Sequence, residues 1–116
     1  MTSPEATGIV LRIAADRAVE FEAMFAAEEL PIWDDFTARG LFLDARLVRV
    51  AGGSEATEGI QDYLLHILAA DSAAHGAHDA DPRFRAFLAK ARKMQPKEPL
   101  VWFGEPIFRR SAGVEA

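Results

Sequence analysis

The chain has 116 residues, half of them hydrophobic and 27% charged, which fits one globular domain over residues 1–116. It has no cysteine, which excludes disulfides and cysteine nucleophiles, and its net charge of -5 argues against binding to nucleic acid. No window approaches the roughly 20 apolar residues of a membrane span, and no signal peptide is recognisable, so we expect a cytoplasmic protein without a membrane partner.

The first third of the chain predicts a strand followed by a long helix. Residues 8–15 are rich in β-branched side chains and form the strand, after a loose tail over residues 1–7. Asp16 is a candidate N-cap for the helix, and Gly40 ends it. Pro31 predicts a kink or two joined helices, because proline lacks an amide and clashes with the preceding turn. The helical stripe expected to face the core comprises Phe21, Phe25, Glu28, Ile32 and Phe36.

The middle of the chain predicts two strands. In residues 41–50, the odd-numbered side chains from Leu41 to Leu47 share an apolar face, and Phe42 lies on the opposite, mixed face. A loop containing glycine then leads to residues 61–70, which give the clearest strand signal and carry the only tyrosine. Both faces of this third strand are largely apolar, so we expect both of them to be covered.

The last third predicts two helix starts and a final strand. Asp71 and Asp81 are each placed to cap a helix, since their carboxylates can accept hydrogen bonds from the exposed amides of the first turn. Residues 100–103 begin the fourth strand. Gly104 indicates a bulge or an edge position, and residues 107–109 are expected to resume the strand.

The element order is therefore βαββαβ, which is typical of a ferredoxin-like α+β fold with its core at about residues 8–110. Such a chain forms one four-stranded antiparallel sheet with its helices on one face. The other face carries apolar side chains as well as charges, and exposing it to water is unfavourable by about 25 cal/mol per Å² of apolar area. Pairing two such sheets removes this exposure, so we expect a homodimer that forms through the open face.

Two short segments carry a family resemblance. Glu28–Pro31, followed by Gly40 and a strand, is similar to the kinked first helix of EthD-like proteins, which often have a histidine where this chain has Glu29. Asp81–Phe84 resembles the Asp-Pro step of YCII-like proteins. The whole pattern resembles the dimeric α+β-barrel superfamily, which also includes antibiotic-biosynthesis and haem-degrading monooxygenases. Haem-degrading members need an asparagine, and this chain contains none. The resemblance implies the fold, a dimer, and a substrate pocket between the sheet and its helices.

Four polar residues are predicted to share the face of the sheet that lies away from the helices: Arg12, Asp44, Arg46 and His66. A histidine near a carboxylate could act as an acid–base pair, because its pKa lies near neutrality. These charges alternate with apolar side chains, however, and burying unpaired charges is costly. We therefore predict that they pair with one another or across the dimer interface.

A second group is predicted on the helix side of the sheet. Tyr63 is expected to face Trp33 and Phe36, and its hydroxyl could orient or protonate a small hydrophobic or aromatic ligand. We predict Tyr63 and His75 as catalytic residues, and Trp33 and Phe36 as ligand-binding residues. The alternative for Tyr63 is a core tyrosine whose hydroxyl is held by a backbone group.

A third group, around the two helix starts, consists of His75, His78, Asp79 and Asp81. Imidazole and carboxylate ligands suit zinc or iron, and His75 and His78 would share a helix face. No matching ligand pair occurs elsewhere in the sequence, and a polar junction between two helices accounts for the same residues. We therefore predict no metal and no other cofactor.

Two functions remain open from the sequence. The first is a small-molecule enzyme or accessory protein that carries out cofactor-free oxidation, isomerisation or cyclisation of an aromatic or polyketide-like compound, as the family resemblance implies. The second is a non-catalytic dimeric module with a binding or structural role. A closed core on the helix side favours the second function, and a cavity of several hundred Å³ there counts against it.

Overall fold

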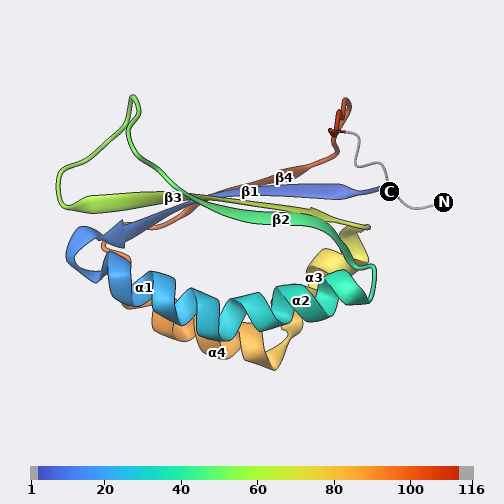
Figure 1. Cartoon of the computed structure of the whole chain (residues 1–116), viewed down its shortest axis with the longest axis horizontal. Coiled ribbons are helices and arrows are strands. Elements are labelled where there is room, and N and C mark those ends of the chain that lie inside the picture. The colour runs from blue at the N-terminus through green and yellow to red at the C-terminus, as the bar shows by residue number, and fades with distance from the viewer. Residues whose placement is uncertain (1–2, 113–116) are drawn as a thin grey trace.

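The computed structural model describes residues 3–112 and contains one four-stranded antiparallel sheet with the strand order β2-β3-β1-β4. The helices lie on one face of this sheet and leave the other face uncovered (Figure 1). This arrangement confirms the predicted ferredoxin-like fold. None of the helices within residues 3–112 is long and apolar enough to cross a membrane. The strands are β1 (Glu5–Ala14), β2 (Phe42–Arg49), β3 (Ile60–Ala69) and β4 (Leu100–Gly104).

The predicted first helix is continuous but contains a π-helical turn. The 3-10 turn at its start contains Asp16, and no side chain caps either this turn or α1, so the prediction that Asp16 caps the helix is wrong. The π turn ends immediately before Leu30 and Pro31, as expected from the missing proline amide and the crowding by the proline ring. The successive parts are η1 (Ala15–Arg17), α1 (Ala18–Met24), η2 (Phe25–Glu29) and α2 (Leu30–Ala38).

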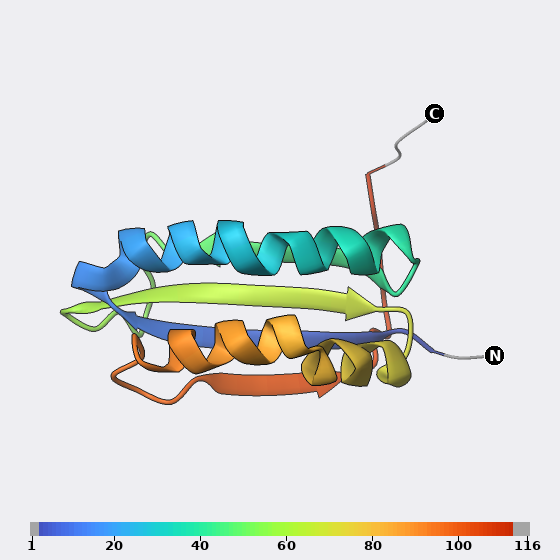
Figure 2. The ribbon, with the colours of Figure 1, turned by 90° about the horizontal axis from the view of Figure 1, so that it is seen from below.

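The second helical segment consists of α3 (Ser72–Ala80) and α4 (Pro82–Arg92). Both predicted caps are confirmed, since Asp71 accepts a hydrogen bond from the Ala74 amide and Asp81 accepts one from the Arg83 amide, each at 2.8 Å. Seen from the helical side, α1 and α2 form one row along the sheet, and α3 and α4 form a second row beside it (Figure 2).

The ends of the strands differ from two predictions. β1 already begins at Glu5, so residues 5–7 belong to the sheet and not to a loose tail. β4 is an edge strand that pairs with β1 alone, as predicted, but it ends at Gly104 and residues 107–109 do not resume it. Ile107 and Phe108 are consequently left exposed, at 78% and 83%.

A β-bulge in β2 reverses the predicted orientation of its first residues. Phe42 pairs with Ala69 and Asp44 pairs with Leu68, so Leu43 is the extra residue. Phe42 is 2% exposed and lies in the core, whereas Leu43 is 47% exposed. The prediction that Leu43 faces the core and Phe42 faces away is therefore wrong, because one inserted residue inverts the alternation of side chains along a strand.

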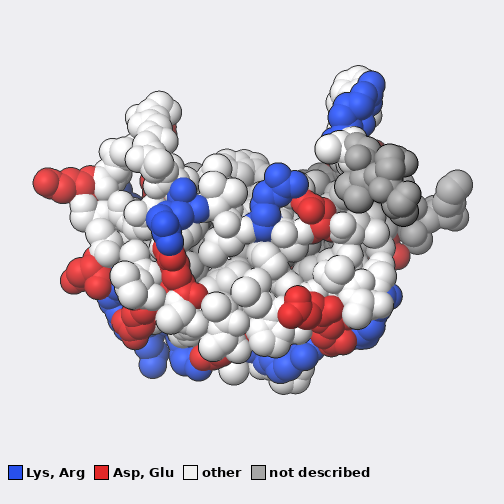
Figure 3. All heavy atoms as spheres, viewed as in Figure 1, with Lys and Arg blue, Asp and Glu red and all other residues white. Residues whose placement is uncertain are grey.

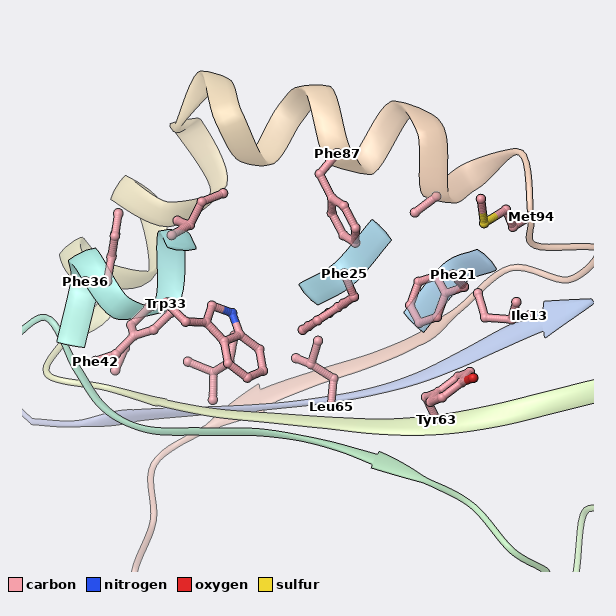
Figure 4. Close-up of a cluster of buried hydrophobic side chains, with 14 of the residues drawn as sticks. Ile13, Phe21, Phe25, Trp33, Phe36, Phe42, Tyr63, Leu65, Phe87 and Met94 are labelled. Atoms are coloured by element: carbon pink, nitrogen blue, oxygen red, sulfur yellow. The ribbon is translucent and has the colours of Figure 1, made fainter. Parts of the chain in front are cut away.

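The core lies between the sheet and the two rows of helices and is rich in aromatic rings. Phe25 and Phe87 extend toward each other from facing helices, and Leu65 and Tyr63 rise from the sheet below them (Figure 4). The Phe25 and Phe87 ring centroids are 5.6 Å apart in an edge-to-face arrangement. Charged side chains of both signs are interspersed over the helical layer outside this core (Figure 3).

The bulge predicts unequal effects of two neighbouring substitutions. We expect Phe42→Ala to lower the free energy of unfolding by about 3–5 kcal/mol, because it leaves a cavity in the core. We expect Leu43→Ala to change it by less than about 0.5 kcal/mol, because this side chain is largely in solvent. Equilibrium unfolding in urea measures both values. A larger loss for Leu43→Ala than for Phe42→Ala would show that β2 follows the regular alternation without a bulge.

Candidate active site

A cavity of about 740 Å³ lies between the sheet and the second row of helices. This volume falls within the roughly 300–1,000 Å³ that is usual for small-molecule pockets. Its floor comes from β1 and β3, and its roof comes from α4. Four phenylalanines contribute to its walls: Phe21, Phe25, Phe84 and Phe87. The cavity is therefore suited to a flat apolar or aromatic molecule.

A buried carboxylate stands in the wall of this cavity. Glu29 is 2% exposed, and its Oε2 accepts a hydrogen bond from Trp33 Nε1 at 2.8 Å and lies 2.7 Å from His78 Nε2. The other oxygen, Oε1, is buried and has no hydrogen-bond partner among the described residues. A buried carboxylate oxygen without a partner is costly, so Glu29, which lines the cavity, carries one unfilled acceptor.

The π turn accounts for the position of this carboxylate. Glu29 is the last residue of η2, and the widened turn places it on the buried face beside Phe25. Glu28 points outward and pairs with Lys90. The prediction that Glu28 belongs to the inward stripe is therefore wrong, because that stripe assumed 3.6 residues in every turn. Single π turns are frequent at functional sites.

The environment of His78 favours its charged form. Burial of the ring opposes the charge, but the hydrogen bonds and charges of Glu29 and Asp79 outweigh this effect and raise the pKa of His78 above its usual value. The ring also packs against Phe84, with ring centroids 4.3 Å apart. His78 is therefore a buried hydrogen-bond partner that holds one oxygen of Glu29 in place, in an environment that favours its charged form.

His75 lines the same cavity, one helical turn before His78. Its Nδ1 is hydrogen-bonded to Glu5 at the start of β1, and its Nε2 lies 3.2 Å from Asp79 Oδ2. The predicted neighbourhood of His75, His78 and Asp79 is thus present. Within residues 3–112, however, no three histidine, aspartate or glutamate side chains converge in a group that could hold a metal ion.

The other three residues predicted for the pocket lie outside the lining of this cavity. Trp33 donates a hydrogen bond to Glu29, so it is linked to the cavity through that carboxylate. Phe36 packs against Phe42, with ring centroids 5.1 Å apart. The Tyr63 hydroxyl faces away from Trp33 (Figure 4). The prediction that these side chains touch the pocket is therefore wrong.

The Tyr63 hydroxyl is held by an ion pair at the opposite end of the core. It donates to Glu22 Oε2 at 2.6 Å, and Glu22 also pairs with Arg49. Hydrogen bonds from Arg49 and Tyr63 lower the pKa of Glu22 to about 2. Burial and the Glu22 carboxylate raise the pKa of Tyr63 above its usual value. This tyrosine is a poor proton donor in the ground state, and its partner is a side chain and not the backbone group that the alternative interpretation expected.

The four polar residues predicted for the open face do share that face. Asp44 Oδ2 lies 2.8 Å from Arg46 Nη2 and 3.8 Å from His66 Nδ1. Arg12 stands opposite Asp62 in the register of β1 and β3. Exposed apolar side chains surround these charges, as expected for a surface that another sheet could cover: Val48, Leu64, Leu100 and Trp102.

Comparison with known proteins finds similar folds at low sequence identity. A candidate antibiotic biosynthesis monooxygenase from Caulobacter crescentus is 21% identical with a TM-score of 0.72, and the match covers 92% of each chain. Rv0793 from Mycobacterium tuberculosis is 17% identical with a TM-score of 0.74, covering 94% of this chain and all of that one. A variant of SnoaB, a cofactor-independent oxygenase from Streptomyces nogalater, is 20% identical with a TM-score of 0.64, covering 90% and 95%.

No family model and no curated protein matches the sequence. The structural matches nevertheless establish that the chain has the fold of antibiotic-biosynthesis-monooxygenase-like α+β-barrel proteins, as the sequence resemblance implied. A shared fold at this identity does not carry a reaction with it. The chemistry open to this chain therefore depends on the cavity and on the residues that line it, Glu29 among them.

The raised pKa of His78 predicts a pH dependence of stability. The folded protein binds this proton more tightly than the unfolded chain does. The contribution of His78 is therefore fully present below the ordinary pKa of 6.5 and is lost as the pH rises through the higher folded pKa. Urea unfolding of the wild type and of His78→Gln, from about pH 5 to about pH 9, isolates this loss.

We expect the difference in unfolding free energy between the wild type and His78→Gln to shrink as the pH rises. His66→Gln, on the open face of the sheet, is the matched control. Its unfolding free energy should fall with rising pH as that of the wild type does. Parallel pH profiles for the wild type and His78→Gln would contradict the pairing of a charged His78 with Glu29.

Proposed function

We propose that this protein is a cofactor-independent oxygenase that acts on a small aromatic or polyketide-like compound bound in the cavity. The observation that carries the proposal is the state of Glu29, a buried carboxylate with one oxygen held by two N–H donors and the other without a partner. SnoaB, which shares the fold, is a cofactor-independent oxygenase. That likeness supports the choice of reaction, and the acid–base chemistry rests on the residues of this chain.

In the proposed reaction Glu29 is the general base. Its Oε1 removes a proton from an acidic CH₂ group that lies between the substrate's aromatic rings, and the resulting carbanion donates an electron to dioxygen. The substrate radical and superoxide then combine, and return of the proton gives a hydroperoxide. This hydroperoxide loses water to leave a ketone. The balance is one CH₂ and one O₂ converted to one C=O and one H₂O. A positioned base typically contributes about 10²- to 10⁴-fold to such a rate.

His78 and Trp33 serve as positioning residues in this scheme. Their hydrogen bonds hold Oε2 and thereby direct the unpaired Oε1, so the carboxylate needs little reorganisation when substrate arrives. We propose His75 as the proton donor that assists loss of water, because it lines the same cavity and its Nε2 lies 3.2 Å from Asp79 Oδ2. The aromatic walls formed by Phe25 and Phe87 would hold the substrate rings.

The alternative reactions share the first step of this one. Isomerisation and cyclisation of a polyketide-like compound also begin with proton removal, but they consume no dioxygen. A purely structural module with a closed core is disfavoured by the cavity of about 740 Å³. Oxygen uptake therefore separates the proposed reaction from its alternatives.

We further propose that the open face of the sheet forms a homodimer interface. The support is its composition: Trp102 is 59% exposed, Leu64 is 46% exposed, and the charged group of Asp44, Arg46 and His66 lies among such apolar side chains. An exposed apolar surface of this kind on the face opposite the helices favours association with a second sheet.

Removal of the unpaired oxygen tests the reaction. With a hydroxyanthrone as the probe substrate, we expect Glu29→Gln to lower kcat for oxygen uptake about 10²- to 10⁴-fold, because the amide keeps the shape but cannot accept a proton. An oxygen electrode, corrected for spontaneous oxidation, measures the rate. Glu28→Gln, one residue earlier and outside the cavity lining, should retain the wild-type rate. Equal rates for wild type and Glu29→Gln would refute the assignment.

The dimer is tested by light scattering at micromolar concentration. We expect the wild type to have twice the mass of the chain and Leu64→Asp to have the mass of one chain, because a charge in the interface has no partner. Val19→Asp is the control, since Val19 is 85% exposed on the helical layer and should leave the dimer intact. A monomeric wild type would overturn the proposed interface.

A further inference from the structure

The cavity has two chemically different ends. The buried pair of Glu29 and His78 lies at one end, beside Phe84 near the start of α4. Arg92 and Lys97 line the cavity at the other end, where α4 leads into β4, and no other lysine or arginine among the described residues lines it. Gln95 lines the cavity at this end as well and has a buried Oε1 without a hydrogen-bond partner.

The fold keeps these two ends apart. The start of β1 meets α3 through the bond between Glu5 and His75, and the end of β1 meets the end of α4 through the Ala14 amide, which donates to the Met94 carbonyl at 2.9 Å. Phe84 and Arg92 are separated by eight residues of α4, which corresponds to about 12 Å along the helix axis. The cavity is therefore elongated, with its acid–base pair at one end and its cations at the other.

The cations at the second end are available to a ligand. The ion pairs within residues 3–112 engage other lysines and arginines and leave both Arg92 and Lys97 unpaired. Glu98 also lines this end, so its net charge is +1 from two cations and one carboxylate. An arginine and a lysine together at the mouth of an apolar cavity suit a carboxylate, which the arginine can bind in bidentate fashion.

From this arrangement we infer that the substrate is an aromatic carboxylic acid. Its carboxylate binds to Arg92 and Lys97, and its reactive carbon reaches Glu29 at the far end of the cavity. This inference rests on the proposed function for the identity of the reacting end and adds the chemical class of the substrate. The cations then select the acid and fix which end of the molecule meets the base, since binding in reverse would leave a carboxylate beside Glu29.

Binding of a matched pair of probes tests the inference without any turnover. The probes are anthraquinone-2-carboxylate and its uncharged analogue anthraquinone-2-carboxamide, with affinities measured by isothermal titration calorimetry at low salt. For the wild type we expect the acid to bind at least about tenfold more tightly than the amide, and this preference should fall as salt screens the charges.

Two variants assign the preference to this end of the cavity. In Arg92→Gln/Lys97→Gln we expect the two probes to bind equally, whereas Lys93→Gln, which removes an exposed charge at the same helix end but outside the cavity lining, should keep the preference. Equal binding of both probes to the wild type, no binding of either, or a preference that survives in the double variant would each overturn the inference.

The same measurement separates this inference from the proposed reaction. Glu29→Gln should retain the preference for the acid, because the carboxylate binds at the other end. If the preference is present but Glu29→Gln oxidises the hydroxyanthrone at the wild-type rate, the base is wrong and the substrate class stands. If Glu29→Gln is inactive and the wild type shows no preference, the substrate class alone fails.

Discussion

The buried carboxylate of Glu29 is the constraint on which the site depends. It links the first helical row to the second, because Trp33 belongs to α2 and His78 belongs to α3. A buried carboxylate is tolerated only when it is paired and hydrogen-bonded, and breaking such a pair typically costs about 3–5 kcal/mol. The fold therefore accommodates Glu29 through its hydrogen bonds to His78 and Trp33, and the environment of His78 favours the charged form of that ring. The arrangement that stabilises Glu29 holds Oε2 with two hydrogen bonds and leaves Oε1 without a hydrogen-bond partner among the described residues.

Pro31 and the π turn explain how an acidic residue comes to face the core. The proline has no amide to donate to the preceding turn, and the helix widens just before it, where the Leu30 amide donates to the Phe25 carbonyl. The widened turn carries Glu29 to the buried side and leaves Glu28 outside, where Lys90 neutralises it. The cavity forms between this turn, the sheet and α4, so the irregularity in the helix coincides with the candidate site.

Much of the architecture could be predicted because it depends on local signals. Asp71 and Asp81 cap their helices as their position before the helical segments suggested, and the strands form the expected four-stranded antiparallel sheet. Two of the failures occurred where one extra residue changes the period of a strand or a helix. The bulge at Leu43 and the π turn at Glu29 both shift a pattern that was read as regular, and only the π turn has a sequence signal beside it, which is Pro31. The prediction for Tyr63 identified its face correctly, but its hydroxyl partner Glu22 is 41 residues away.

The most direct test of the site is a crystal structure of the protein with a hydroxylated anthraquinone bound. The role of Glu29 predicts that the rings lie against Phe25 and Phe87 in the cavity and that a ligand hydroxyl donates to Glu29 Oε1, while Trp33 and His78 keep their bonds to Oε2. A ligand seated elsewhere, or one bound in the cavity with Oε1 still unpaired, would contradict the claim that this carboxylate is the reacting group.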